Sequence, residues 1–171
     1  MASPEIKGIA TTAKLGGHPI HPMLVPFPIA LMFATFLCDL VYWGSGNPFW
    51  ADAAYWSLLV AIVGAALAAM AGFTDFLGNA QIRAMNAAWQ HMIGNVILVV
   101  LALVSFWLRV TEGAAEAVLP WGLLLSTVIF ALLLFTAWKG GDMVYEHRVG
   151  MHPEAPAETS ASAGQDRGLH A

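Results

Sequence analysis

Charged residues and cysteine are both scarce in this chain. Only 11% of its 171 residues are charged, whereas a soluble domain carries roughly 25%. The only cysteine, Cys38, excludes an intramolecular disulfide. The seven lysines and arginines form no basic cluster, so nothing in the sequence indicates binding to nucleic acid. Water is therefore not the solvent for which most of this chain is built.

Apolar residues take the place of the missing charges. They make up 58% of the chain, give a mean hydropathy of +0.68, and gather in four stretches, at 23–43, 53–73, 92–108 and 120–138. About 20 helical residues cross a hydrocarbon core of roughly 30 Å. The predicted fold is all-α, a four-helix transmembrane bundle with its N- and C-termini on the same side. Residues 1–22 form a polar lead-in with a His-Pro motif, 23–150 the four-span transmembrane domain, and 151–171 a disordered tail.

The positive charges indicate which side that is. Six of the seven belong to the N-terminal segment, the middle loop or the C-terminal segment: Lys7, Lys14, Arg83, Lys139, Arg148 and Arg167. Loops rich in lysine and arginine stay in the cytoplasm. We therefore expect both termini to be cytoplasmic.

Two charged residues fall within or at the end of the spans, near the opposite face. Asp39 lies about a turn from the outer end of the first span, and Arg109 at the outer end of the third. A charge buried in lipid costs several kcal/mol unless it is protonated, hydrated or paired. The sequence favours a structural ion pair between them over an acid on a proton pathway.

The histidines are the candidate functional residues. Odd-numbered spans begin, and even-numbered spans end, on the same face, so topology alone brings four of the six histidines together. The expected ligands are His21, His91, His147 and His18. Asp75, Asn95 and Tyr145 are expected to orient their rings or to contact the propionates of a bound haem. His18 and His21 each precede a proline, which disfavours the helical conformation and predicts a stiff, extended hook. Pro26 and Pro28 predict a kink or a late start in the first span.

Imidazole nitrogen suits zinc, copper, iron and nickel, and haem iron takes axial histidines. The cluster contains neither cysteine nor glutamate, which argues against a zinc-finger-like or di-iron carboxylate site. The leading interpretation is a b-type haem, with a metal ion as the alternative, and His21 with His91 as the first choice of axial pair. The competing interpretation is structural: the His/Asp cluster stabilises the bundle or docks a partner in a non-catalytic membrane subunit.

Three blocks of sequence resemble a known family. They are the double His-Pro motif at 17–25 with Phe-Pro-Ile-Ala at 27–30, Gly-Phe-Thr-Asp at 72–75 with His91 and Asn95, and the Trp-Lys-Gly-Gly ending at 138–150. Together they resemble the bacterial membrane proteins known as domain of unknown function 2231 and cover about residues 16–151.

That resemblance implies four spans in a bacterial inner (plasma) membrane. Some members of the family accompany, or are fused to, Rieske-type or cytochrome electron carriers, so it also implies a redox role and an electron-carrier protein as partner besides the lipid bilayer. Many relatives carry histidine where this chain has Pro26, so a ligand supplied from that position is absent here. Self-association into a homo-oligomer is left open.

Overall fold

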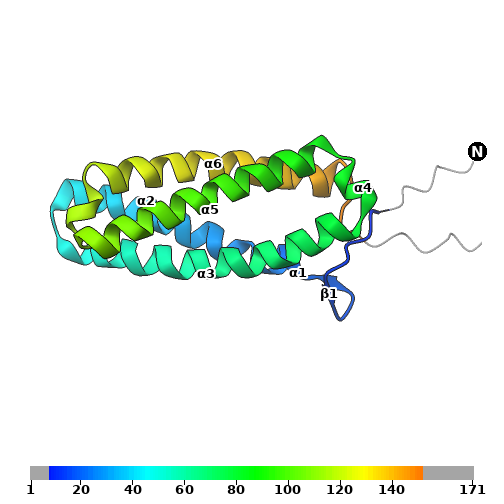
Figure 1. Cartoon of the computed structure of the whole chain (residues 1–171), viewed down its shortest axis with the longest axis horizontal. Coiled ribbons are helices and arrows are strands. Elements are labelled where there is room, and N and C mark those ends of the chain that lie inside the picture. Colours follow the sequence, from blue (N-terminus) through cyan, green and yellow to red (C-terminus); the bar gives the residue numbers. More distant parts are fainter. Residues whose placement is uncertain (1–7, 152–171) are drawn as a thin grey trace, which may run out of the picture.

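Four long helices form the molecule. The computed structural model describes residues 8–151, and Figure 1 shows the helices lying side by side along one axis. The described elements are β1 (Lys14–Leu15), β2 (His18–Pro19), α1 (Ile20–Leu24), α2 (Pro26–Ser45), α3 (Pro48–Gly78), α4 (Ala80–Arg83), α5 (Asn86–Glu112), the 3₁₀ turn η1 (Glu116–Val118) and α6 (Trp121–Tyr145). We call the two ends of the bundle the α4 end and the η1 end.

The predicted four-span, all-α fold is confirmed. Four segments are long and apolar enough to cross a membrane, namely Ile20–Ser45, Pro48–Gly78, Asn86–Glu112 and Trp121–Tyr145. Each is longer than its hydrophobic stretch, because polar residues continue the helix beyond the apolar part. At 1.5 Å per residue, α3 is about 46 Å long, so its ends extend past a core of roughly 30 Å.

The prolines divide the first span into two helices. α1 ends at Leu24 and α2 begins at Pro26, while Val25 between them keeps helical backbone angles, with φ of −54° and ψ of −36°, and donates to the His21 carbonyl at 3.1 Å. At the η1 end, Gly46 closes α2 with a φ of 63°, and Asn47 caps α3 by accepting a hydrogen bond from the Phe49 amide. α2 and α3 therefore form one hairpin and α5 and α6 a second.

A layer of apolar residues fills the middle of the bundle, and the outer surface is apolar as well. The middle layer comprises Met32, Leu58, Ala61, Leu98, Ala102, Ile129 and Leu133, contributed by all four long helices. On the outside, Trp43, Trp56, Val100 and Leu134 are each more than half exposed. A soluble monomer rarely shows so much continuous apolar surface. The outer face of this bundle is suited to lipid.

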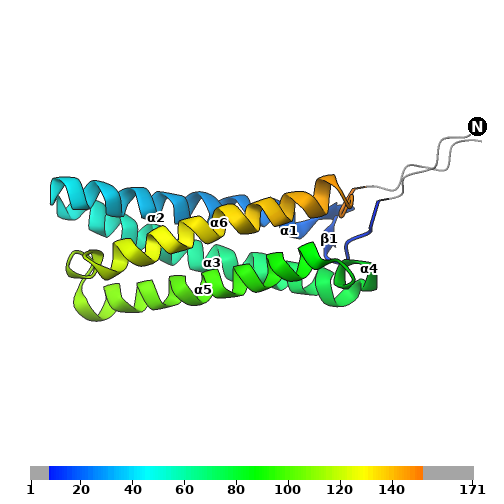
Figure 2. The ribbon, with the colours of Figure 1, turned by 90° about the horizontal axis from the view of Figure 1, so that it is seen from above.

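The two ends of the described chain meet at the α4 end. Ile9 pairs with Val149 in a parallel bridge, and the Gly150 amide donates to the Ile9 carbonyl at 2.9 Å. Figure 2 shows the first and last described segments, in blue and orange, at this side of the bundle, near α4. Of the predicted tail at 151–171, only Met151 belongs to the described residues, and 152–171 lie outside them.

Candidate functional site

His21 is positioned by the break in the first span. β2 is extended at His18–Pro19, as the prolines predict, but His21 lies in α1, so the prediction of an extended hook through His21 was wrong. Proline is tolerated in the first helical turn because the amides there have no acceptor within the helix. Pro22 therefore continues α1, and the His21 ring meets α3.

A backbone carbonyl and a glycine of α3 hold that ring. Nδ1 of His21 lies 2.8 Å from the carbonyl oxygen of Ala68. One turn further on, a methyl group on Gly72 would lie 2.9 Å from the same Nδ1. The imidazole thus fits against α3 only where that helix has no side chain.

His91 is held in the same way in the second hairpin. Its Nδ1 lies 2.8 Å from the carbonyl oxygen of Thr136 in α6. A methyl group on Gly140, four residues later, would lie 3.1 Å from Cε1 of His91. In each hairpin, a histidine at the start of one span bonds a carbonyl of the next, four residues before a glycine. Both hairpins therefore hold their histidine with the same arrangement of a carbonyl and a glycine.

The carbonyl partners determine the tautomer of both rings. A carbonyl oxygen can only accept, so Nδ1 of His21 and of His91 must carry the proton. Each neutral ring then has its lone pair on Nε2. Histidines that ligate metals through Nε2 usually donate their other N–H to a carbonyl or carboxylate, which fixes the ring orientation. Both rings have this arrangement.

The two histidines lie next to each other. Their ring centroids are 6.0 Å apart and their planes are nearly perpendicular, at 87°. They come from different hairpins, so the pair lies between the two halves of the bundle. The topology therefore brings His21 and His91 together, as the sequence predicts.

A cavity of about 580 Å³ surrounds the pair. Ligand pockets typically measure 300–1,000 Å³. Its walls come from all four long helices and are mostly apolar, including Val25, Ile29, Phe73, Val96 and Val144. The middle layer of the bundle closes it on one side. Toward the α4 end, it is lined by members of a second apolar cluster, namely Phe76, Ile82, Ala88, Met92, Met143 and Val149.

Asp75 and Asn95 line this cavity but serve other partners. Oδ1 of Asp75 accepts the Thr12 and Ala13 amides at 2.6 and 2.7 Å, which fastens the N-terminal segment across the α4 end. Asn95 donates to the carbonyl oxygen of His91, on its own helix. The sequence predicted that these side chains orient the imidazole rings. In the structure, the carbonyl oxygens of Ala68 and Thr136 orient the rings of His21 and His91.

The remaining expected residues lie at the surface. The side chains of His18, His147 and Tyr145 are all exposed, Tyr145 by 82%. Nδ1 of His18 lies 3.1 Å from the Gly16 carbonyl within its own turn. Tyr145 reaches the edge of the cavity. Within residues 8–151, no group of three or more His, Cys, Asp or Glu side chains is arranged to hold a metal ion.

Sequence reasoning missed Thr11 and Gly140. Thr11 is buried and lines the cavity, and its hydroxyl has no hydrogen-bond partner in the part of the chain that the structure describes. Nothing in the polar lead-in distinguishes it. Gly140 has a detectable signal, because Gly72 and Gly140 each precede an aspartate by two or three residues near the end of an even-numbered span.

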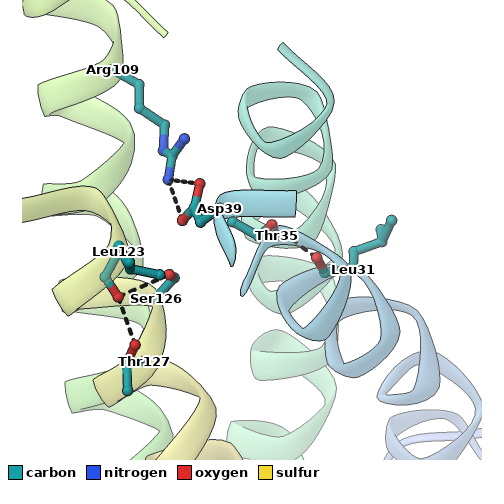
Figure 3. Close-up of polar contacts among 7 residues, drawn as sticks. All are labelled: Leu31, Thr35, Asp39, Arg109, Leu123, Ser126 and Thr127. Atoms are coloured by element: carbon teal, nitrogen blue, oxygen red, sulfur yellow. Dashed lines mark hydrogen bonds and ion pairs between the residues drawn. The ribbon is translucent and has the colours of Figure 1, made fainter. Parts of the chain in front are cut away.

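The predicted ion pair between Asp39 and Arg109 is confirmed at the η1 end. Nη2 of Arg109 lies 2.8 and 2.7 Å from the two carboxylate oxygens of Asp39, and both side chains are fully buried. Figure 3 shows Arg109 reaching from α5 to Asp39 on α2, with Ser126 of α6 nearby. The pair joins the two hairpins. The middle layer separates it from the histidine cavity.

The comparisons with known proteins give the class. The family described as "Predicted membrane protein (DUF2231)" matches residues 17–153. The chain therefore belongs to this family of predicted membrane proteins. No curated protein and no solved structure matched it.

Proposed function

We propose that this membrane protein is a small redox component that holds one b-type haem between His21 and His91. The observation that carries the proposal is the ring pair itself. Two neighbouring imidazoles, one from each hairpin, each donate Nδ1–H to a backbone carbonyl and keep the Nε2 lone pair for a ligand. The haem would supply the one-electron chemistry, and the protein would supply the axial nitrogens and a dry cavity.

The spacing of the rings supports a shared metal. A metal–nitrogen bond to histidine is about 2.0 Å, and a ring nitrogen lies about 1.1 Å from the imidazole centre. Two imidazoles on opposite sides of one metal therefore have centroids about 6.2 Å apart by this geometry. The observed separation is 6.0 Å.

The set of donors favours haem over a bare ion. A structural or catalytic zinc site uses three or four protein ligands, and no such group occurs among residues 8–151. Haem brings four nitrogens of its own, so two axial histidines complete its coordination. The apolar walls suit a macrocycle. A metal ion held by two imidazoles and water is the alternative ligand.

The structural interpretation rests on the same two hydrogen bonds. His21 ties α1 to α3, and His91 ties α5 to α6. Such bonds between transmembrane helices average about 0.6 kcal/mol each. They do not require a cavity of 580 Å³ beside them. That volume supports a ligand in addition to any stabilising role.

The test is a spectrum of the protein purified in mild detergent from cells well supplied with haem. We expect a Soret band, a reduced-minus-oxidised difference typical of a b-type cytochrome, and one iron per chain. Absence of both the band and a bound metal by elemental analysis would overturn the proposal in favour of the structural subunit. Metal without a Soret band would select the metal-ion alternative. If the Soret band is present, the haem-containing protein is then used to search for an electron-carrier partner.

A further inference from the structure

A short β-hairpin precedes the first span. Its strands, β1 and β2, pair antiparallel, and Gly16 and Gly17 form the turn between them. These two glycines have φ of 57° and 86°. A two-residue turn with positive φ at both positions matches the twist of a hairpin, and glycine adopts it without steric cost. The polar lead-in therefore ends in a defined structural element.

The base of this hairpin is fixed to the bundle. Asp75 of α3 accepts the Thr12 and Ala13 amides, just before β1. The Ala13 carbonyl in turn accepts the Ile20 amide at 3.0 Å. Ile20 is also the first residue of the first span. The hairpin is therefore held at the level where a transmembrane segment begins, and its direction is set by α1 and α3.

The tip of the hairpin stands clear of the rest of the described chain. A methyl group added at Gly16 or Gly17 would meet no atom within 4 Å apart from its own chain neighbours, and the side chain of Leu15 is 70% exposed. Figure 1 shows the turn after β1 projecting sideways from the end of the bundle, across the direction of the long helices. Beside a bundle, at the level where its spans begin, the surrounding medium is the headgroup layer of the bilayer.

The hairpin also carries a cation that has no partner within residues 8–151. Arg109 and Lys139 form ion pairs with aspartates, Arg83 donates to two backbone carbonyls, and Arg148 also has an interaction within the protein. Lys14 is exposed in β1 and makes no such contact there. Successive side chains of a strand point to opposite faces, so Lys14 and Leu15 lie on opposite faces of the hairpin.

We propose that the β1–β2 hairpin binds the headgroup layer at the α4 end, where Leu15 enters the apolar boundary of that layer and Lys14 pairs with the phosphate of an anionic phospholipid. An element that lies in this layer turns an apolar face toward the hydrocarbon and a charged face toward phosphate and water, as the two faces of the hairpin allow. Anionic lipids attract lysine near the membrane surface. The haem takes no part, because neither side chain lines the histidine cavity.

The first experiment locates the tip of the hairpin in lipid nanodiscs. Leu15→Cys in a Cys38→Ala background carries a small fluorophore, which nitroxide-bearing lipids quench from within the bilayer and iodide quenches from water. Gln81→Cys with the same label is the control, because Gln81 is exposed in α4 at the same end. We expect the nitroxide lipids to quench the label at residue 15 more strongly than the one at residue 81, and iodide to do the reverse. A label at residue 15 that iodide quenches as strongly as the control would place the hairpin in water, free for a soluble partner, and would overturn the proposal.

The second experiment tests the charge. Native mass spectrometry measures how much phosphatidylglycerol the protein retains when it is released from nanodiscs of phosphatidylglycerol and phosphatidylcholine. We expect Lys14→Gln to retain this lipid about fivefold more weakly than the wild type, the effect of one lysine at an anionic surface. Lys139→Gln removes the same charge from the same end but should lose less, because Asp142 already neutralises that lysine. Retention by Lys14→Gln equal to that of the wild type, or an equal loss in both variants, would contradict the assignment of Lys14.

Discussion

A histidine ring inside a membrane protein needs a partner for each nitrogen or a reason to leave one free. In His21 and His91 the partner of Nδ1 is a carbonyl that already belongs to a helix, and the glycine one turn later provides room for the ring. Three residues thus define each half of the site: the histidine, the carbonyl residue and the glycine. Nε2 is left for a ligand.

Removal of one axial ring should change the coordination of the haem. In His91→Ala we expect the six-coordinate, low-spin spectrum to give way to a five-coordinate, high-spin one, or haem to be lost, because a single ligand remains. His147→Ala is the control, since its side chain is exposed at the same end. The absorption spectra of the two variants decide this. Equal loss of haem in both would contradict the assignment of the axial pair.

The glycines should be as sensitive as the histidines. Gly72→Ala places a methyl group 2.9 Å from Nδ1 of His21, and we expect weaker haem binding, because overpacking costs about 1–3 kcal/mol. Gly140→Ala should act in the same direction with less effect, at 3.1 Å from His91. Gly141→Ala is the control, because its nearest neighbour, in Tyr145, is 3.9 Å away. Haem titration of the apoproteins measures the differences. A Gly141→Ala variant as impaired as Gly140→Ala would show that α6 tolerates no added side chain here and that the contact with the His91 ring is not the cause.

At the scale of elements, the N-terminal segment is fastened by one carboxylate. Asp75→Ala removes the carboxylate oxygen that accepts both the Thr12 and the Ala13 amide. The probe is Thr11→Cys in a Cys38→Ala background, because Thr11 belongs to this segment and is buried. With Asp75→Ala added, we expect a maleimide to label this cysteine at least about tenfold faster than in the parent that keeps Asp75. The reason is that hydrogen bonds to a charged group contribute about 1.5 kcal/mol or more each, so their loss lets the segment open more often.

Asp142→Ala provides the comparison for that labelling experiment. Asp142 lies at the same end, but it pairs with Lys139 three residues away on its own helix. Its removal should leave the labelling rate near that of the parent. If Asp75→Ala also leaves the rate unchanged, Asp75 does not hold the segment.

The ion pair joins elements at the other end. Asp39→Asn leaves the buried Arg109 guanidinium without its counter-charge, and we expect the free energy of unfolding to fall by about 3–5 kcal/mol. Adding Arg109→Leu should restore part of the loss by removing the unpaired charge. Thermal unfolding in detergent measures each variant. The exposed Asp52→Asn is the control, and a loss in it equal to that in Asp39→Asn would refute the role of the pair.

The sequence predicts the spans and the buried ion pair, but not the backbone partners of the site residues. Hydrophobic length predicts the four spans, and the cost of a charge in lipid predicts the partners Asp39 and Arg109. The partner of Asp75 was not predictable, because backbone amides are present at every position and leave no trace in the residue type. The same holds for the carbonyls of Ala68 and Thr136. Side-chain reasoning found the two rings but not what orients them.

At the scale of the whole molecule, an even number of spans places the described ends of the chain together, and they are joined by the Ile9–Val149 bridge. Lys14, Arg83, Lys139 and Arg148 all lie at this end, while Arg109 is neutralised in its ion pair. Loops rich in positive charge stay in the cytoplasm. We therefore expect a C-terminal fluorescent reporter that folds only in the cytoplasm to be active, and a periplasm-dependent phosphatase to be inactive. The opposite result would invert the orientation.

The whole account depends on one haem held by two rings from different hairpins. Electron paramagnetic resonance of the oxidised protein tests this most directly, because the signal reports both the number of axial imidazoles and the angle between them. His21 and His91 have ring planes at 87° to each other. A haem held by both rings at that angle would have two iron orbitals nearly equal in energy, so we predict a low-spin signal with unusually large anisotropy. A high-spin signal, from iron with a single axial histidine, would contradict the account.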